Sequence, residues 1–246
     1  MPELTVHYQP IVDLNTGGVV GFEALSRLVD PDGTSHSAGE LIEQMEKNVE
    51  ALYSLISETL RCVQKDFVSL FNKYADFYVS VNVSPIVLGG NGVFDLLEKM
   101  HLRPYLNRLV CELTERQALT DVGRVALETA RQHGIRVAID DFGTGHSGLA
   151  QIVGLNLDIL KIDRSLILSI PANRTAARLI RGLVALAGIM RMHTVVEGIE
   201  TREQALFLQA AGVDAGQGYL WSNAIPADEL EIVIQTGFSV DFGRFG

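Results

Sequence analysis

The feature that most constrains the fold of this chain is the alternation of short apolar runs with longer amphipathic segments. Short runs rich in valine, isoleucine and leucine predict eight strands, near Val6–Val12, Val19–Leu28, Phe77–Val83, Leu109–Leu113, Arg136–Ile139, Ile159–Ile162, Thr194–Val196 and Val213–Ala215. Helical periodicity predicts helices at Glu50–Phe71, Val93–Met100, Asp121–His133, Arg174–Arg191 and Arg202–Ala211. Strands that alternate with helices in this way are typical of repeated βα units and a mainly parallel sheet.

The first two predicted strands are joined by Asp13–Gly18, which is too short for a helical crossover and favours a hairpin. The fold class is therefore α/β, a TIM-like (β/α)8 barrel with one antiparallel strand near the N-terminus. The 246 residues suit one barrel, and no long linker interrupts them, so we expect a single domain over residues 1–246. The polar stretches Asp30–Ser37 and Leu88–Gly92 are expected to be loops.

Composition and short sequence patterns indicate how the strands are buried, where the protein is located and which partners are excluded. The hydrophobic fraction of 47% and the mean hydropathy of +0.20 suit strands that are buried on both faces. The longest apolar stretch, Gly182–Met190, is far shorter than the ~20 residues that cross a bilayer, so it predicts a buried helix. The beginning, MPELTVHYQP, lacks the pattern of a secretion signal, which favours the cytoplasm. A net charge of −10 argues against a nucleic-acid polymer or an anionic membrane as partner.

Polar side chains recur where the predicted strands end. In a βα barrel, residues at the carboxyl ends of the strands build the active site. The last inward-facing position of seven strands is polar: Glu23, Asn82, Glu112, Asp140, Lys161, Glu197 and Gln217. Each alone has an ordinary explanation, such as a helix cap, an Asx turn or an ion pair at the barrel rim. Together, we expect them to converge.

Several carboxylates in one barrel mouth repel one another unless they are protonated or bound to cations. A set of carboxylate and amide oxygens suits Mg²⁺ or Mn²⁺ rather than zinc. The sequence therefore predicts a hard-metal site with a lysine beside it, and metal-assisted phosphoryl or hydrolytic chemistry is the natural use of such a site.

Three other protein classes are excluded because the sequence lacks further motifs that each of them requires. Asp141-Phe-Gly143 matches the metal-binding tripeptide of protein kinases, but no glycine-rich nucleotide loop or HRD catalytic loop accompanies it. Gly143-Thr-Gly145 lacks the downstream lysine and hydroxyl residue of a P-loop. The Gly-x-Ser-x-Gly pattern of α/β-hydrolases is absent from the sequence.

The same residues fall in motifs that resemble those of EAL domains, the cyclic di-GMP phosphodiesterases, over nearly the whole chain. The matching motifs are YQPIVDLNTGGVVGFEALSR at 8–27, VNVSP at 81–85, CELTER at 111–116, AIDDFGTG at 138–145, LKIDRS at 160–165, VVEGIET at 195–201 and GQGYLWSNAIP at 216–226. EAL alone would be a weak signal, whereas seven motifs in family order are a strong one.

The resemblance implies two divalent metal ions, Mg²⁺ or Mn²⁺. It implies that the first ion is bound by Glu23, Asn82, Glu112 and Asp140, and that Asp140 and Asp141 bind the second. It further implies that three residues act on the attacking water: Lys161 holds it, Glu197 is a general-base candidate and Gln217 orients it.

The resemblance also implies how the substrate and the neighbouring loop are held. Arg27, with the backbone near Leu25, is expected to bind a substrate phosphate, and Gln9 is expected to approach a guanine base. Glu115 is expected to anchor the loop that follows Asp141.

The implied reaction is hydrolysis of one phosphodiester of cyclic di-GMP to linear 5′-pGpG. Two alternatives stay open: a non-catalytic cyclic di-GMP receptor and a protein-interaction module of the same fold. A homodimer is also expected from the resemblance.

The adjacent acids in VAIDDFGTG pose a structural question, because neighbouring side chains of a strand point to opposite faces. Both acids reach one site only if the backbone leaves strand geometry at Asp141, which we expect. Gly143 and Gly145 allow the loop to bend around the site. His146, where the family commonly has tyrosine, is expected to be a solvated loop side chain.

Overall fold

The closed barrel is built from eight strands in the part of the chain that the computed structural model describes, which is residues 3–29, 35–37, 48–90, 92–143 and 154–238. Its strands are β1 (Glu3–Asp13), β2 (Val19–Val29), β4 (Tyr78–Asn82), β5 (Leu109–Thr114), β6 (Arg136–Phe142), β7 (Ile159–Ile162), β8 (His193–Val196) and β9 (Ala215–Gly216). Strands β2 and β4 to β9 pair in parallel, and β1 closes the ring by pairing antiparallel with both β2 and β9. The predicted barrel with one antiparallel strand near the N-terminus is confirmed.

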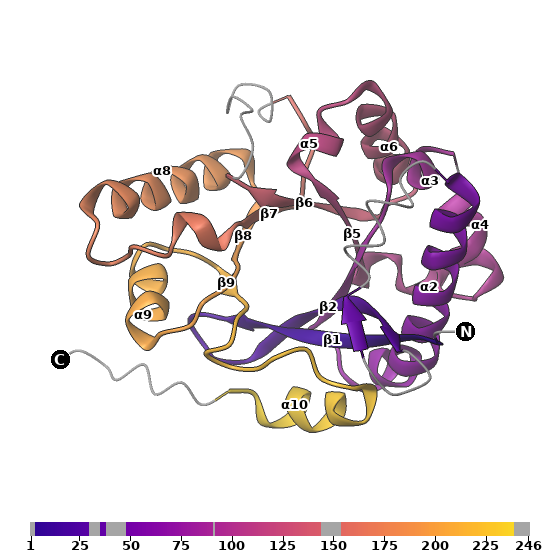
Figure 1. Cartoon of the computed structure of the whole chain (residues 1–246), viewed down its shortest axis with the longest axis horizontal. Helices are drawn as coiled ribbons and strands as arrows, with labels where there is room; N and C mark the ends of the chain where they lie inside the picture. The colour runs from indigo at the N-terminus through magenta and orange to yellow at the C-terminus, as the bar shows by residue number, and fades with distance from the viewer. Residues whose placement is uncertain (1–2, 30–34, 38–47, 91, 144–153, 239–246) are drawn as a thin grey trace.

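Helices surround this ring of strands (Figure 1). They are α2 (Val49–Lys73), α3 (Pro85–Gly89), α4 (Gly92–Lys99), α5 (Glu115–Ala118), α6 (Asp121–Gln132), α8 (Arg174–Met190), α9 (Arg202–Ala210) and α10 (Leu230–Thr236), with 3₁₀ turns η1 (Arg103–Arg108), η2 (Arg164–Leu166) and η3 (Ala227–Glu229). Four long helices begin at side chains that accept a hydrogen bond from the first turn: Asn48, Thr120, Asn173 and Thr201. Such caps satisfy backbone donors that the helix itself leaves open.

Three expectations about individual segments were wrong. The predicted loop at Asp30–Ser37 contains a short strand, β3 (Ser35–Ser37), which pairs antiparallel with the outer part of β2. The predicted loop at Leu88–Gly92 holds the end of α3 and the first residue of α4. The apolar stretch Gly182–Met190 lies in α8, and only one face of it is buried, because Ile189 is 81% exposed.

Inside the barrel, a layer of apolar side chains fills the half nearer the amino ends of the parallel strands. Six inward-facing residues form it: Ile11, Val110, Ala138, Ile159, Val195 and Ala215. The ring of Tyr78 packs against them and lies flat on Gly21, where a Cβ atom would come within 2.8 Å of the ring. The rest of the core lies between the strands and the helices. The polar side chains at the strand ends pack directly on this apolar layer.

In the described part of the chain, no helix combines the length and apolar character needed to cross a membrane.

Candidate functional site

A polar layer lies directly above the apolar layer of the barrel, two residues further along five strands. Because side chains alternate between faces, a step of two keeps the side chain on the inner face. The apolar residues Val110, Ala138, Ile159, Val195 and Ala215 are thus followed by Glu112, Asp140, Lys161, Glu197 and Gln217. The site sits at the carboxyl ends of the parallel strands, which is the active-site end of such barrels.

Lys161 stands at the centre of this layer and is 1% exposed. Its Nζ atom lies 2.7 Å from Glu112 Oε2 and 3.1 Å from Glu23 Oε2, and it donates hydrogen bonds to both. The same atom lies 3.0 Å from Asp140 Oδ1 and 2.7 Å from Glu197 Oε1. An ammonium group has three protons, so it cannot satisfy four carboxylates at once.

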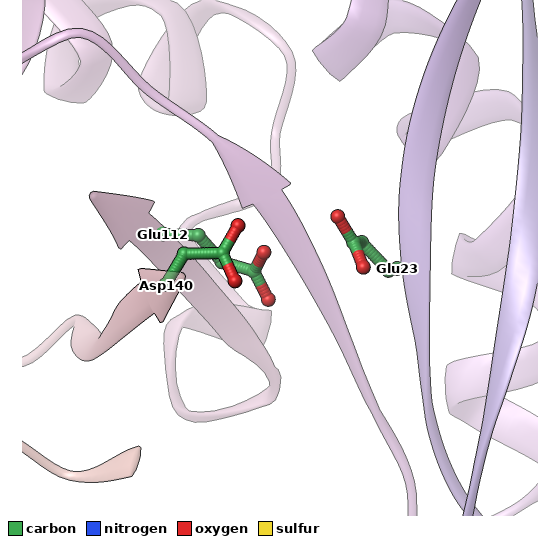
Figure 2. Close-up of side chains that lie close together, drawn as sticks. All are labelled: Glu23, Glu112 and Asp140. Carbon is green, nitrogen blue, oxygen red and sulfur yellow. The ribbon is translucent and has the colours of Figure 1, made fainter. Parts of the chain in front are cut away.

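Glu23 connects the lysine to the two amides predicted for the site. Its Oε1 atom accepts a hydrogen bond from Asn82 Nδ2 at 3.0 Å, and its Oε2 atom accepts one from Gln217 Nε2 at 2.7 Å. Figure 2 shows Glu23 on one side of the barrel, facing Glu112 and Asp140 from the strands on the other side. The structure thus brings all seven predicted strand-end residues into one cluster.

The electrostatics of the cluster reflect burial and an excess of negative charge. Burial, followed by repulsion from Glu23 and Asp140, raises the pKa of Glu112 to about 8, although Lys161 opposes the shift. Burial also raises the pKa of Glu197 well above its usual value. For Asp140, burial is outweighed by Lys161 and by hydrogen bonds, which hold the pKa below its usual value. Burial opposes the charge of Lys161, but the surrounding carboxylates raise its pKa.

Asp141 joins the cluster through its backbone conformation. It has a φ angle of +57°, and the pairing of β6 with β7 is irregular between Ile139 and Phe142. Ligand atoms of Asp140, Asp141 and Glu197 therefore all lie within 4.8 Å of one another. Burial and repulsion from Asp140 raise the pKa of Asp141 to about 6. The expectation that the backbone leaves strand geometry at Asp141 is confirmed.

The donor set fits divalent metal ions. Oxygen atoms of Glu23, Glu112 and Asp140 form a second group within 4.8 Å, and Asp140 belongs to both groups. Gln217 Oε1 is buried without a hydrogen-bond partner among the described residues. Carboxylates that share a site repel one another, and this repulsion raises their pKa values. A hard cation bound between them would offset the repulsion and would also coordinate oxygen atoms that lack a hydrogen-bond partner.

Glu115 contacts the backbone two residues after Asp141. It is 3% exposed at the start of α5, and its Oε2 atom accepts a hydrogen bond from the backbone N–H of Gly143 at 3.2 Å. Gly143 has a φ angle of +107°, and a Cβ atom there would meet Leu166 at 2.4 Å. The predictions for Gly145 and His146 lie outside the described residues.

The residues predicted to bind substrate lie on the β1–β2 hairpin, beside the cluster. Gln9 is the cross-strand partner of Glu23, and its Nε2 atom donates to the backbone oxygen of Ser222 at 3.4 Å. Leu25 and Arg27 follow Glu23 at alternate positions, so they share its face of β2 and extend away from the lysine-centred cluster. This arrangement gives Arg27 a place at the rim.

Sequence reasoning left out two residues near the site. Asp163 follows Lys161 by two residues, and its charge contributes to the raised pKa of Asp141. Ser80 precedes Asn82 by two residues on β4 and is completely buried. In both cases the signal was present, because period-two alternation places each residue on the face of a predicted site residue.

The barrel and its buried cluster define a class of protein: a (β/α)8-type barrel with an oxygen-rich site for hard metal ions at the carboxyl ends of its strands. Within this class, the chain belongs to the EAL domain family, whose model matches residues 2–224.

Similarities to individual proteins agree with this family assignment. PdeB of Escherichia coli (strain K12), named a probable cyclic di-GMP phosphodiesterase, is 33% identical over 233 residues, covering 93% of this chain and 44% of PdeB. The structure titled PaMucR phosphodiesterase, c-di-GMP complex, is 32% identical with a TM-score of 0.79 and covers 92% of this chain and 94% of that chain. Klebsiella pneumoniae BlrP1 in its manganese/cy-diGMP complex is 28% identical with a TM-score of 0.76, covering 92% of this chain and 58% of that chain.

The chain spans less than half the length of the curated relatives it matches, with 44%, 28% and 32% of three of them covered. Those proteins carry additional segments beyond the region of similarity.

Proposed function

We propose that this chain is a metal-dependent phosphodiesterase that hydrolyses cyclic di-GMP to linear 5′-pGpG. The observation that carries the proposal is the convergence of a full set of oxygen ligands and a lysine in a family whose relatives are named cyclic di-GMP phosphodiesterases. The set comprises Glu23, Asn82, Glu112, Asp140, Asp141 and Lys161.

The metal ligands would divide between two divalent ions, Mg²⁺ or Mn²⁺. We assign Glu23, Asn82, Glu112 and Asp140 to the first ion, and Asp140 with Asp141 to the second. The sharing of Asp140 by the two oxygen groups supports this division. When bound, such ions lower the pKa of water and stabilise the negative charge of the phosphate.

Three residues of the chain would act on the reacting water and its proton. In the reaction, the water oxygen bonds to phosphorus, the bond from phosphorus to the 3′ oxygen breaks, and that oxygen leaves with a proton. Lys161 would hold the water, Gln217 would orient it through its free Oε1, and Glu197 would accept its proton. The raised pKa of Glu197 supports its assignment as the base, because it makes the carboxylate a better proton acceptor.

The substrate would lie across the rim formed by the β1–β2 hairpin. Arg27 would bind a phosphate together with the backbone near Leu25, and Gln9 would approach a guanine base. Glu115 would fix the start of the loop after Asp141 through its bond to Gly143.

A product assay tests the proposal. Purified protein is incubated with cyclic di-GMP and either Mg²⁺ or Mn²⁺, and the nucleotides are separated by chromatography. We expect linear pGpG with metal and none with EDTA. Glu23→Ala should abolish turnover, whereas Arg103→Ala, at an exposed ion pair away from the barrel mouth, should retain it. A wild-type protein that forms no product with either metal would refute the proposal.

Two further variants separate chemistry from binding. Lys161→Ala and Glu197→Gln should lower kcat more than they weaken substrate binding, because both residues are assigned to the water. An unchanged kcat in both variants would contradict these assignments.

A binding measurement and a cellular comparison, added to the product assay, test the alternatives. A non-catalytic receptor would bind cyclic di-GMP in the presence of metal without forming product. An interaction module would keep its cellular effect in the Glu23→Ala variant. The intact ligand set favours the enzyme over both.

We also propose that the chain works as a homodimer, as a single domain over residues 1–246 and in the cytoplasm. The dimer is supported by an exposed apolar surface on two packed helices, formed by Ile86 of α3 with Val122 and Val125 of α6. These three residues are referred to below as the α3–α6 surface.

A further inference from the structure

Ser80 is a buried polar residue that the proposed mechanism does not use. It lies in the middle of β4, is 0% exposed, and its hydroxyl has no hydrogen-bond partner among the described residues. Burying a hydroxyl group without a partner is unfavourable, so such a residue in a native barrel calls for an explanation.

The strand register identifies the group that Ser80 faces. In β4, Ser80 pairs laterally with Glu23 of β2 on one side and with Val110 of β5 on the other. Neighbouring parallel strands lie ~4.8 Å apart, and laterally paired residues project to the same face. Ser80 therefore shares the inner face with Glu23 and Val110. Valine offers no polar group, which leaves the Glu23 carboxylate as the polar lateral neighbour of the Ser80 hydroxyl.

Among the described residues, the Glu23 carboxylate has three hydrogen-bond donors, and its Oε1 atom accepts from only one of them, which leaves an acceptor position for a further donor. The three donors are Asn82, Gln217 and Lys161. The lysine, however, occupies the same oxygen group of Glu23, Glu112 and Asp140 that fits a cation. A divalent ion held by these three carboxylates would compete with the ammonium group, and Glu23 would then lose Lys161 as a donor.

We propose that Ser80 is a positioning residue for Glu23, whose hydroxyl donates to the Glu23 carboxylate when a divalent cation replaces Lys161 as its partner. A serine hydroxyl rotates freely about its χ1 bond and can supply this donor. Metal ligands are commonly oriented by a hydrogen bond from a neighbouring residue, and losing that bond weakens metal affinity by ~10–100-fold. This inference rests on the proposed metal-dependent function.

The test compares metal affinity with the stability of the metal-free protein. Mn²⁺ binding is measured by isothermal titration calorimetry on the full chain without nucleotide, and the melting temperature is measured in EDTA. Ser80→Ala removes the hydroxyl. Ser80→Cys nearly preserves the volume but replaces the hydroxyl with a weak donor. Thr59→Val is the control, because Thr59 is a buried hydroxyl on α2 that bonds to Leu55 and Ser26.

Both Ser80 variants should raise the Kd for Mn²⁺ by ~10-fold or more. The metal-free melting temperature of Ser80→Ala should not fall, because an unpartnered buried hydroxyl stabilises nothing. Thr59→Val should show the reverse pattern, a lower melting temperature with an unchanged Kd.

Three results would overturn the inference: a Kd of Ser80→Ala equal to that of wild type, a wild-type Kd in Ser80→Cys alone, or a melting temperature that falls together with metal affinity. The second would assign the effect to packing, and the third to general destabilisation. A wild-type protein that binds no Mn²⁺ would instead refute the metal-dependent function itself, so the two failures are distinguishable.

Discussion

At the scale of single residues, the backbone of Asp141 determines whether two adjacent acids share one site. In an uninterrupted strand Asp141 would point away from Asp140. Its φ angle of +57° redirects it, and both carboxylates then approach Glu197. Aspartate and asparagine are the residues other than glycine that adopt this left-handed conformation most readily, since their short polar side chains bond locally.

Two substitutions at this position separate conformation from charge. Asp141→Asn keeps the preference for the left-handed conformation and removes the charge, whereas Asp141→Ala removes both. We expect both variants to lose metal-dependent turnover. In the metal-free protein, urea denaturation should find the alanine variant ~1 kcal/mol less stable than the asparagine variant. Equal unfolding free energies for the two would mean that the backbone conformation carries no such cost.

The pKa of Glu112 gives a second residue-scale prediction, the pH dependence of stability. Its folded value of about 8 lies above its ordinary value of 4.5, so the folded metal-free protein holds a proton that the unfolded chain releases. The stabilisation is complete below pH ~4.5 and is lost as the pH rises to ~8. Metal binding favours the ionised carboxylate, so it should restore more stability at the upper end of this window.

Thermal melting from about pH 5 to about pH 8, in EDTA and in Mn²⁺, measures this effect. We expect the metal-induced increase in melting temperature to grow with pH. Glu112→Gln should weaken the dependence in EDTA, and the raised pKa values of Asp141 and Glu197 should preserve part of it. An increase that stays constant across the window would contradict the predicted proton release.

At the scale of elements, Arg108 holds the C-terminal end of α2 against the barrel. Its guanidinium group donates to the backbone oxygens of Phe71, Tyr74 and Phe77 at 2.6, 2.7 and 3.0 Å. It also stacks over the rings of Phe71 and Phe77. Helix ends leave carbonyl groups without intrahelical partners, and this one planar side chain satisfies the end of α2 and the segment before β4.

Arg108→Lys keeps the charge but loses the planar group that reaches three carbonyls and stacks on two rings. We expect a loss of ~2 kcal/mol in the free energy of unfolding, measured by urea denaturation. Arg103→Lys is the matched control, since Arg103 makes only an exposed ion pair with Glu98 and should change stability little. An Arg108→Lys variant as stable as Arg103→Lys would show that Arg108 acts through its charge alone.

Elements with several periods of hydrophobic pattern could be predicted from the sequence, and the shorter ones could not. The long helices α2, α6, α8 and α9 and most barrel strands were located to within a few residues. The one-turn helices α3 and α5 and the three-residue β3 are too short for a period to emerge. β9 was predicted to begin two residues too early, because the apolar Val213 belongs to the helix–strand packing and not to the ladder.

The residues of the site could be predicted more completely than the boundaries of the elements around it. Barrel topology brings strand ends together, so position and parity were enough to select Glu112, Asp140 and Lys161 as neighbours. A departure from strand geometry at Asp141 was expected only because both acids needed to reach one site, and its left-handed form was not predicted. The crowding of four carboxylates on Lys161 depends on side-chain distances that no sequence pattern contains.

At the scale of the whole molecule, successive direct contacts connect the outer helix α6 to the site. Helices α5 and α6 pack so closely that a Cβ atom on Gly123 would lie 2.0 Å from the backbone oxygen of Gln117. Helix α5 carries Glu115, which bonds to the backbone of Gly143, two residues after Asp141. Any partner that moves α6 would therefore act on the helix that bonds to the backbone beside the proposed metal ligands.

The α3–α6 surface is where a second copy of the chain would exert this influence. Ile86, Val122 and Val125 are 44%, 48% and 58% exposed on helices that pack side by side. Val125→Asp places a charge in this apolar surface, so it should convert a dimer to a monomer in light scattering. Val49→Asp is the matched control, because Val49 is 49% exposed on α2.

The change in oligomeric state should carry a change in activity. If the dimer positions α6, Val125→Asp should lower turnover of cyclic di-GMP while leaving the melting temperature near that of Val49→Asp. Turnover lost without dissociation would place the effect within one subunit, and dissociation without loss of turnover would separate assembly from catalysis. A wild-type protein that is monomeric at all concentrations would remove the α3–α6 surface as a dimer interface, and Glu115 would then anchor Gly143 independently of any partner.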